Sequence, residues 1–327
     1  MIPFKKINLG ESMDRIKPLI DSGYIGLGNV VYDFEKKLAQ YVGTKEAVAF
    51  DSCTSALFIS LLWEKMHDRL NPKLVIPSMT VPLVACAIRE AGVDFMFNRE
   101  TSWVGSEYQL MGSLIFDSAH ELRRNQWKEN GHNLDAEKIC FSFYPTKTIG
   151  SADGGAVATN DLEFAEWARK IITYGRNQQK NYGNSWDYDV EMFGYKRHWT
   201  NLQAAIALEQ LERLDSTANV RNAIRRRYNR ELGLSNTSEY LYRINVTDQN
   251  KFIEFMKSKE IECGVHFKPL HLMKPFAEIA MDGVDRAQVE RAYRQTVSLP
   301  FFDMMTDREV TTVIDAVEES GMLIYSD

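Results

Sequence analysis

Cysteine is scarce in this sequence, and its spacing excludes two common kinds of stabilising site. The 327 residues include four cysteines, and none of them forms a C-x-x-C pair. They are Cys53, Cys86, Cys140 and Cys263. A zinc motif or a disulfide framework needs cysteines at characteristic spacings, so neither is indicated. We expect reduced thiols and no metal site.

Long apolar runs and a continuous charge of one sign are missing as well. No stretch approaches the roughly 18–20 apolar residues that cross a membrane. The opening residues, MIPFKKINLG, lack the apolar core of a signal peptide. Acidic and basic residues are interspersed at a formal net charge of −6, which offers no continuous positive field to a nucleic acid. The sequence predicts a soluble, cytoplasmic protein without a membrane or nucleic-acid partner.

Short apolar runs alternate with amphipathic helical patterns over the first two thirds of the chain. The runs are EAVAF (46–50), KLVIP (73–77), VDFMF (93–97), GSLIFD (112–117), KICFSF (138–143) and GAVATN (155–160). They lack clean polar alternation, which is typical of strands covered on both faces. This pattern predicts an α/β domain with a mostly parallel sheet over residues 1–205.

The pattern changes in the last third of the chain. An apolar stripe over 201–214 predicts a long linking helix. Strand-like EYLYRINV (239–246), a helical pattern over 248–260 and strand-like CGVHF (263–267) then predict a β-α-β unit, with helices near 285–295 and 306–320. We therefore expect the linking helix and a small α+β domain over residues 206–327.

Small polar residues follow the first predicted strand. Ser52, Thr54 and Ser55 lie where the run 46–50 gives way to a helix. Hydroxyls and free backbone N–H groups at a helix N-terminus form an anion site that suits a phosphate. An ordinary serine N-cap explains the same pattern.

Candidate catalytic or binding residues follow two more of the predicted strands. Asp117 ends an apolar run, and His120 follows it. A buried carboxylate needs a partner such as a protonated ring nitrogen. Alternatively, Asp117 caps the turn that follows. Ser142 and Lys147 follow the run 138–143. Lys147 is either a solvated loop charge or an amine that forms a Schiff base. An anion cradle, a buried acid and a loop lysine at neighbouring strand ends are what pyridoxal 5'-phosphate needs.

The sequence resembles a known family, the DegT/DnrJ/EryC1/StrS sugar aminotransferases. The resemblance is carried by YIGLGNVVYDFEKKLAQYVGTKEAVAFDSCTSAL, VIPSMTVPLVACAIREAGV, FDSAH, SFYPTKTIGSADGGAVATND, GYKRHWTNLQAAIALEQLERLD, GVHFKPLHLMKPF and VSLPFFDMMTDREV. These segments cover nearly the whole chain. The resemblance implies the fold of type I enzymes that depend on pyridoxal 5'-phosphate, with a large α/β domain and a small C-terminal domain.

The resemblance also implies roles for individual residues. Lys147 would form the internal aldimine and move the proton between coenzyme and substrate. Asp117 would pair with the pyridine nitrogen, Ala119 would pack on the ring, and His120 would lie near its phenolic oxygen. The phosphate would be held by Ser52, Cys53, Thr54 and Ser142. The family has a dehydratase branch in which a histidine replaces this lysine, so Lys147 favours transamination.

A homodimer with sites at the subunit interface is also implied. In the usual pattern an Asn of a GYN motif crosses from the neighbouring chain to the phosphate, and this sequence has Lys196 there. Two further departures are Cys53, where the phosphate turn usually has Gly, and the segment NRETSWVGSEYQLMG (98–112), which is too short for one βα unit of longer relatives. The resemblance places Tyr144, Trp199, His266 and His271 near the substrate, although each is also explained as an ordinary core or edge residue.

The function that follows is an aminotransferase reaction in two half-reactions. We expect the amino group to come from L-glutamate and to reach a keto group of a nucleotide-linked deoxysugar. His120, where many relatives have Gln, favours C4 over C3, as in perosamine-type synthases. The alternatives are a sugar dehydratase that uses the same coenzyme and an inactive protein of this fold that binds or regulates a partner.

Overall fold

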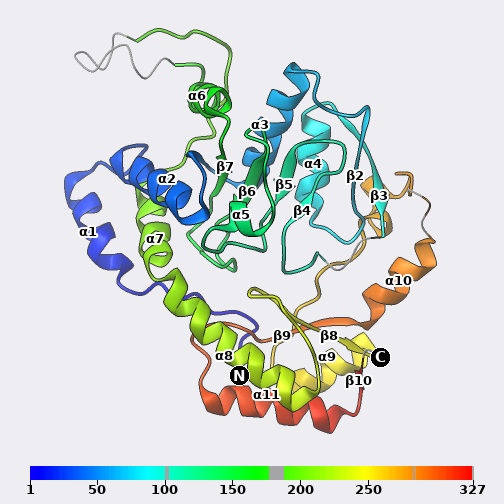
Figure 1. Cartoon of the computed structure of the whole chain (residues 1–327). Helices are drawn as coiled ribbons and strands as arrows, with labels where there is room; N and C mark the ends of the chain where they lie inside the picture. The colour runs from blue at the N-terminus through cyan, green and yellow to red at the C-terminus, as the bar shows by residue number, and fades with distance from the viewer. Residues whose placement is uncertain (100–102, 177–187, 282, 284, 326–327) are drawn as a thin grey trace. The chain divides into compact units, whose positions relative to one another are not determined.

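The structure is a computed structural model of the chain that describes all residues except 100–102, 177–187, 282, 284 and 326–327 (Figure 1). It divides into two compact units. The central unit comprises Leu9–Leu70 and Ser113–Glu212, and the terminal unit comprises Met1–Asn8, Asn71–Gly112 and Arg213–Asp327. The expected domain boundary between residues 205 and 206 stays a prediction.

Four strands of the central unit lie side by side in one sheet, in the order β1-β7-β6-β5. They are β1 (Glu46–Phe50), β5 (Ile115–Asp117), β6 (Lys138–Ser142) and β7 (Gly155–Thr159). Strand β7 is antiparallel to β1 and β6, whereas β5 and β6 are parallel. Three strands therefore run in one direction, which confirms the predicted α/β fold with a mostly parallel sheet. The run 112–117 forms a strand only from residue 115, because Gly112 turns the chain at φ +94°.

Local signals in the sequence set the helices of this unit. Ser52 caps α3 by accepting the N–H of Ser55, and Asp161 caps α6 by accepting the N–H of Phe164. Gly43 ends α2 in the left-handed region at φ +86°. The helices are α1 (Ser12–Ser22), α2 (Asn29–Val42), α3 (Cys53–Met66), α5 (Gln126–Glu129), α6 (Leu162–Ile171) and α7 (Asn201–Glu212).

Helix α3 lies antiparallel along one face of β6. The side chain of Lys138 reaches Glu64 near the end of α3, and Cys140, two residues further along the strand, contacts Ser60, one turn earlier in the helix. Alternate strand residues point to the same face, so Ser142 faces the first turn of α3. On the other face Phe143 packs edge-on against Phe34 of α2 at 5.2 Å. The sheet is thus covered on both sides.

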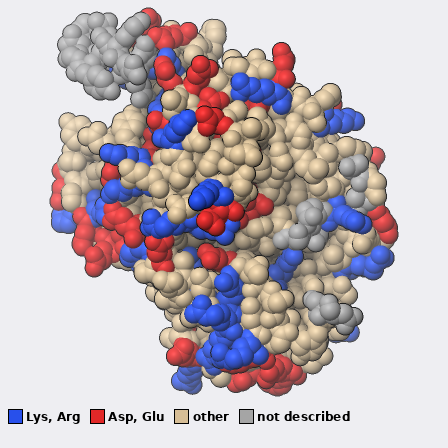
Figure 2. All heavy atoms as spheres, in the orientation of Figure 1, with Lys and Arg blue, Asp and Glu red and all other residues tan. Residues whose placement is uncertain are grey.

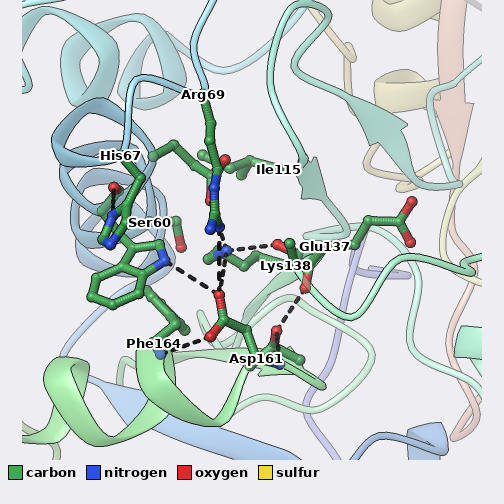
Figure 3. A network of polar contacts seen from close by, with 12 residues as sticks. Ser60, His67, Arg69, Ile115, Glu137, Lys138, Asp161 and Phe164 are labelled. Atoms are coloured by element: carbon green, nitrogen blue, oxygen red, sulfur yellow. Dashed lines mark hydrogen bonds and ion pairs between the residues drawn. The ribbon is translucent and has the colours of Figure 1, made fainter.

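The far end of α3 holds a buried ionic network (Figure 3). The Lys138 ammonium is fully buried and lies 2.7 Å from the Glu64 carboxylate and 3.5 Å from that of Asp161. Arg69 approaches the same two acids at 4.0 and 3.8 Å. Two cations and two anions balance in charge, which makes this burial tolerable. Lys138 begins β6 and Ser142 ends it, so the network and Ser142 lie at opposite ends of the strand.

The terminal unit contains two separate sheets. Strands β2 (Lys73–Pro77) and β3 (Asp94–Asn98) pair in parallel and are connected through α4 (Pro82–Glu90). A second sheet has the order β10-β8-β9 and is antiparallel throughout. Its strands are β8 (Tyr242–Val246), β9 (Thr296–Leu299) and β10 (Leu323–Ile324). The remaining elements are β4 (Tyr108–Gln109), α8 (Leu214–Leu232), α9 (Gln249–Ser258), η1 (Leu270–Leu272), η2 (Lys274–Phe276), α10 (Arg286–Gln295) and α11 (Asp307–Ser320).

One predicted strand, 263–267, is wrong. Only Gly264 of this run joins the sheet, through an isolated bridge to Ser298. The place beside β8 that the β-α-β pattern assigned to this run is occupied by β9 instead. The predicted helices near 248–260, 285–295 and 306–320 are confirmed as α9, α10 and α11.

Charged residues of both signs are interspersed over the face shown in Figure 2. In the lower part of the view Lys and Arg gather where Figure 1 draws α8, the helix that carries Arg225, Arg226 and Arg227. Within the described part of the chain, no helix has the length and apolarity to span a bilayer.

Candidate active site

The ends of three strands meet at one edge of the central sheet. Gly155 of β7 lies opposite Phe50, the last residue of β1, and opposite Ser142, the last residue of β6. A Cβ atom on Gly155 would lie only 2.3 Å from the backbone nitrogen of Cys53. A side chain at position 155 would therefore displace the start of α3. This close approach fixes the Ser52–Cys53 peptide next to the end of β6.

The first turn of α3 presents donors at this edge. Ser52 Oγ accepts the N–H of Ser55 at 3.2 Å, whereas the N–H groups of Cys53 and Thr54 have no acceptor among the described residues. Cys53 is the first helical residue and does not have a positive φ. A side chain in place of the glycine that relatives have is therefore tolerated. The turn offers backbone donors and the Thr54 hydroxyl to an anion.

A buried acid lies at the end of the next strand. Asp117 ends β5 and pairs in register with Cys140 of β6, and it is only 4% exposed. Its Oδ1 accepts the N–H of Ala119 at 2.9 Å, which fixes the carboxylate relative to the turn that follows. His120, one residue further, is buried at 2% exposure. The turn-capping contact that the sequence offers as the alternative for Asp117 is thus present.

Lys147 lies half-buried on a loop that is held at both ends. Its N–H donates to Tyr144 O at 2.9 Å, and the Ser151 N–H donates to Phe143 O at 2.9 Å. Gly150 is bound from both sides by one amide, because the Gln210 side chain accepts its N–H and donates to its carbonyl. These hydrogen bonds hold the loop that carries the lysine amine in one conformation.

Electrostatics show that these groups are near one another. Burial is the main cause that raises the pKa of the Cys53 thiol well above its ordinary value, and the negative charge of Asp117 raises it further. The positive charge of Lys147 acts on the same thiol in the opposite direction. Cys53, Asp117 and Lys147, which are far apart in the sequence, thus meet within the range of their charges. The raised pKa keeps the thiol protonated and unreactive at neutral pH.

A comparison with known protein families identifies this arrangement. The model of the DegT/DnrJ/EryC1/StrS aminotransferase family matches residues 8–98 and 104–318. The chain belongs to this family. The interruption at 99–103 falls in the segment 98–112, where the sequence predicts a shortened large domain. The chain is thus an aminotransferase of a family whose members depend on pyridoxal 5'-phosphate.

Several relatives of this aminotransferase are similar over almost their full length. It is 25% identical over 367 residues to the spore coat polysaccharide biosynthesis protein SpsC of Bacillus subtilis, with 94% of each chain covered. It is 23% identical over 363 residues to the GDP-perosamine synthase of Caulobacter vibrioides, with 95% of each covered. The PMP form of a putative sugar aminotransferase, Spr1654 of Streptococcus pneumoniae, has a TM-score of 0.80 at 19% identity over 98% of both chains. That last likeness confirms the fold.

The residues at the sheet edge of the aminotransferase fit its coenzyme. Two amides that have no acceptor in the described part of the chain, together with several hydroxyls at a helix N-terminus, suit a phosphate. A buried carboxylate suits the pyridinium nitrogen, and a lysine amine on a fixed loop suits the aldehyde. Ser52, Cys53, Thr54, Asp117, Ser142 and Lys147 supply these groups in one unit of the structure.

The four expected substrate residues have different surroundings. Tyr144 is 54% exposed beside the Lys147 loop. Trp199 has no exposed surface, donates its indole N–H to Asp153 O and packs on Phe34, which favours the alternative of a core aromatic. His266 and His271 belong to the terminal unit.

The two histidines of the terminal unit are both bound by serines. His266 Nδ1 lies 2.9 Å from Ser298 Oγ, and its ring stacks on Phe4 at 5.4 Å. His271 Nδ1 lies 2.7 Å from the buried Ser78 Oγ, and burial lowers the pKa of His271. These contacts orient both rings, and a role toward substrate stays a prediction for each.

Lys196 is exposed, and its neighbour Arg197 is not. Sequence reasoning missed Arg197, whose guanidinium donates to Ser55 Oγ at the first turn of α3. It also missed Gln210, which holds the Lys147 loop. The quoted motifs GYKRHWTN and NLQAAIALEQL contain both residues, but which distant backbone each would contact is not encoded in their local pattern.

Proposed function

We propose that this aminotransferase moves the amino group of L-glutamate to a keto group of a nucleotide-linked deoxysugar, with C4 favoured over C3. Two relatives support the substrate class, because one is named a GDP-perosamine synthase and another a polysaccharide biosynthesis protein. The observation that carries the proposal is the meeting of Asp117, Lys147 and the first turn of α3 at one sheet edge.

Bound pyridoxal 5'-phosphate supplies an electron sink for the pair left behind when the amino acid loses its Cα proton. Lys147 holds the coenzyme through its amine before the donor arrives. Once free, the same amine would take the Cα proton of the donor, and in the second half-reaction it would move a proton in the reverse direction. The hydrogen bonds of Gln210 to Gly150 hold the loop that carries this amine.

The remaining residues bind and orient the coenzyme. Asp117 keeps a proton on the ring nitrogen, since a buried carboxylate stabilises a positive partner. The amides of Cys53 and Thr54, with the hydroxyls of Thr54 and Ser142, hold the phosphate. Ser52 shapes this turn as the N-cap of α3. We propose that Ala119 packs on the ring and that His120 donates to its phenolic oxygen.

The working form is proposed to be a homodimer in which Lys196 of each chain reaches the phosphate of the other. The exposure of Lys196 in the single chain supports this arrangement. An ammonium is a compact point charge and neutralises a phosphate without the planar geometry that an amide needs. Tyr144, His266 and His271 are proposed to contact the sugar, whereas the burial of Trp199 favours a core role.

The test uses the holoenzyme, L-glutamate labelled with nitrogen-15 and a panel of nucleotide-linked 4-keto and 3-keto deoxysugars. The proposal predicts a labelled amino sugar from at least one 4-keto acceptor and stoichiometric 2-oxoglutarate, as measured by NMR and mass spectrometry. A 3-deoxy product without nitrogen would indicate the dehydratase alternative. Failure of every donor and acceptor to react, with coenzyme bound, would indicate the inactive binding protein.

A further inference from the structure

Arg197 is anchored through its backbone next to the coenzyme site. Its N–H donates to Ile172 O at 2.9 Å, just beyond the last residue of α6. Its carbonyl accepts the N–H of Asp51 at 2.9 Å, and Asp51 directly precedes the N-cap of α3. Contacts on both sides of the residue fix the Cα position. From this position the side chain extends toward the first turn of α3.

Two aromatic rings then fix the guanidinium group. Its central carbon lies 4.6 Å from the ring centroid of Phe58 and 5.4 Å from that of Tyr195. These two rings contact each other edge-to-face at 5.3 Å. Stacking on these rings orients the plane of the guanidinium, in which its N–H groups donate. One of them, Nη1–H, donates to Ser55 Oγ at 3.0 Å.

This cation lies beside a helix end that is itself positive. The N-terminus of an α-helix carries a partial positive charge, so a guanidinium at the first turn is unfavourable unless an anion lies there too. Asp51 is the acid next to this turn, and its carboxylate accepts the Ser52 hydroxyl at 3.2 Å. A dianionic group at the amides of Cys53 and Thr54 would interact favourably with both the helix end and the guanidinium.

We propose that Arg197 is a phosphate-positioning residue of its own subunit, acting on the coenzyme phosphate through the first turn of α3. The inference rests on the proposed coenzyme site. Two adjacent residues then act on different subunits. The partly buried Arg197 acts on the phosphate bound to its own chain, and the exposed Lys196 acts on the phosphate bound to the neighbouring chain. Arg197 thus adds a positive charge in the same chain, directly after Lys196, the residue that stands where the usual pattern has the crossing Asn.

The experiment compares coenzymes with and without the phosphate. Dissociation constants of pyridoxal 5'-phosphate and of pyridoxal are measured by equilibrium dialysis for the full-length protein and for Arg197→Gln. A charge-assisted contact predicts that the variant binds pyridoxal 5'-phosphate roughly tenfold to hundredfold more weakly, while its affinity for pyridoxal is unchanged. Arg197→Lys keeps the charge without the planar fork, and an intermediate loss is expected.

Arg89→Gln is the matched control. Arg89 also stacks on a phenylalanine, Phe95 at 5.2 Å, and also has a polar partner, but it belongs to the terminal unit. Its variant should bind both coenzymes like the parent. Equal weakening of both coenzymes by Arg197→Gln, or no weakening, would overturn the proposal. If Arg197→Gln does not fold, a reduced preference for pyridoxal 5'-phosphate over pyridoxal in Arg197→Lys supports the proposal, and an unchanged preference overturns it.

A failure of the proposed coenzyme site itself gives a different result. In that case the parent protein itself would bind neither coenzyme or would show no preference for the phosphorylated one. Binding of inorganic phosphate gives an independent readout, since it should raise the thermal midpoint of the coenzyme-free parent more than that of Arg197→Gln. This measurement needs no turnover.

Discussion

At the scale of single residues, the chemistry depends on groups that are held by their neighbours. The Lys147 amine is useful only if its loop is rigid, and that rigidity comes in part from Gln210, whose amide binds both polar groups of Gly150. The geometry explains why a glutamine is needed at this helical position. A carboxylate would accept the Gly150 N–H but would repel its carbonyl oxygen.

Gln210→Met is therefore predicted to slow turnover without removing the coenzyme. The side chain is similar in size but makes neither hydrogen bond, so the loop gains freedom and the amine loses alignment. We expect kcat to fall roughly tenfold, with a dissociation constant for pyridoxal 5'-phosphate within about twofold of the parent. Steady-state kinetics and dialysis measure the two quantities. A large loss of coenzyme with unchanged kcat per bound coenzyme would contradict a positioning role.

At the scale of elements, β1 shows how a strand at the edge of the sheet is protected. Ala49 N–H donates to the Glu35 carboxyl group at 2.7 Å, and Ala47 O accepts an N–H of Arg169 at 2.9 Å, so two side chains take the place of a neighbouring strand. Burial raises the pKa of Glu35 to about 7, although the Arg169 charge acts in the opposite direction. The fold therefore favours the protonated carboxyl of Glu35.

The sign of the resulting pH dependence follows from this shift. The contribution of Glu35 to stability is fully present below its ordinary pKa of 4.5 and is lost as the pH rises through about 7. Glu35→Gln cannot titrate, so its free energy of unfolding should decline less between pH 5 and pH 8, by about 2–3 kcal/mol. Urea unfolding at both pH values measures this. Glu46→Gln, which removes a more exposed partner of Arg169, is the control.

The buried network around Lys138 predicts a large effect of removing one charge. Lys138→Met leaves the Glu64 carboxylate buried without its nearest cation, and we expect a loss of about 3–5 kcal/mol in the free energy of unfolding. Lys45→Met, which breaks an exposed pair with Asp135, should cost less than about 1 kcal/mol. Chemical denaturation compares the two. Similar small losses in both variants would show that the network contributes little.

The elements themselves were largely predictable from the sequence, but several contacts between them were not. Apolar runs predict β1, β2, β6 and β7 closely, because burial on both faces leaves a clear signal. The run 263–267 has the same signal and is not a strand, since β9 occupies the place beside β8. Arg197 and Gln210 were missed because each acts on backbone or hydroxyl groups that lie far away in the sequence.

At the scale of the whole molecule, the account predicts sites shared between two subunits. We expect the aminotransferase activity to be low in each of two variants alone, Lys147→Ala and Lys196→Ala. Mixed after dissociation and reassociation, they should recover up to roughly a quarter of parental activity, because half of the dimers then carry one intact site. Size measurement should show a dimer throughout. No recovery in mixed dimers would place Lys196 in the site of its own chain.

The linkage of the coenzyme to the chain tests the central claim most directly. The protein is loaded with pyridoxal 5'-phosphate, reduced with borohydride to fix the coenzyme to its lysine, digested and analysed by peptide mass spectrometry. The account predicts one phosphopyridoxyl group per chain, on Lys147. It also predicts that adding L-glutamate before reduction removes the label. A label on another lysine, with Lys147 unmodified, would contradict the account.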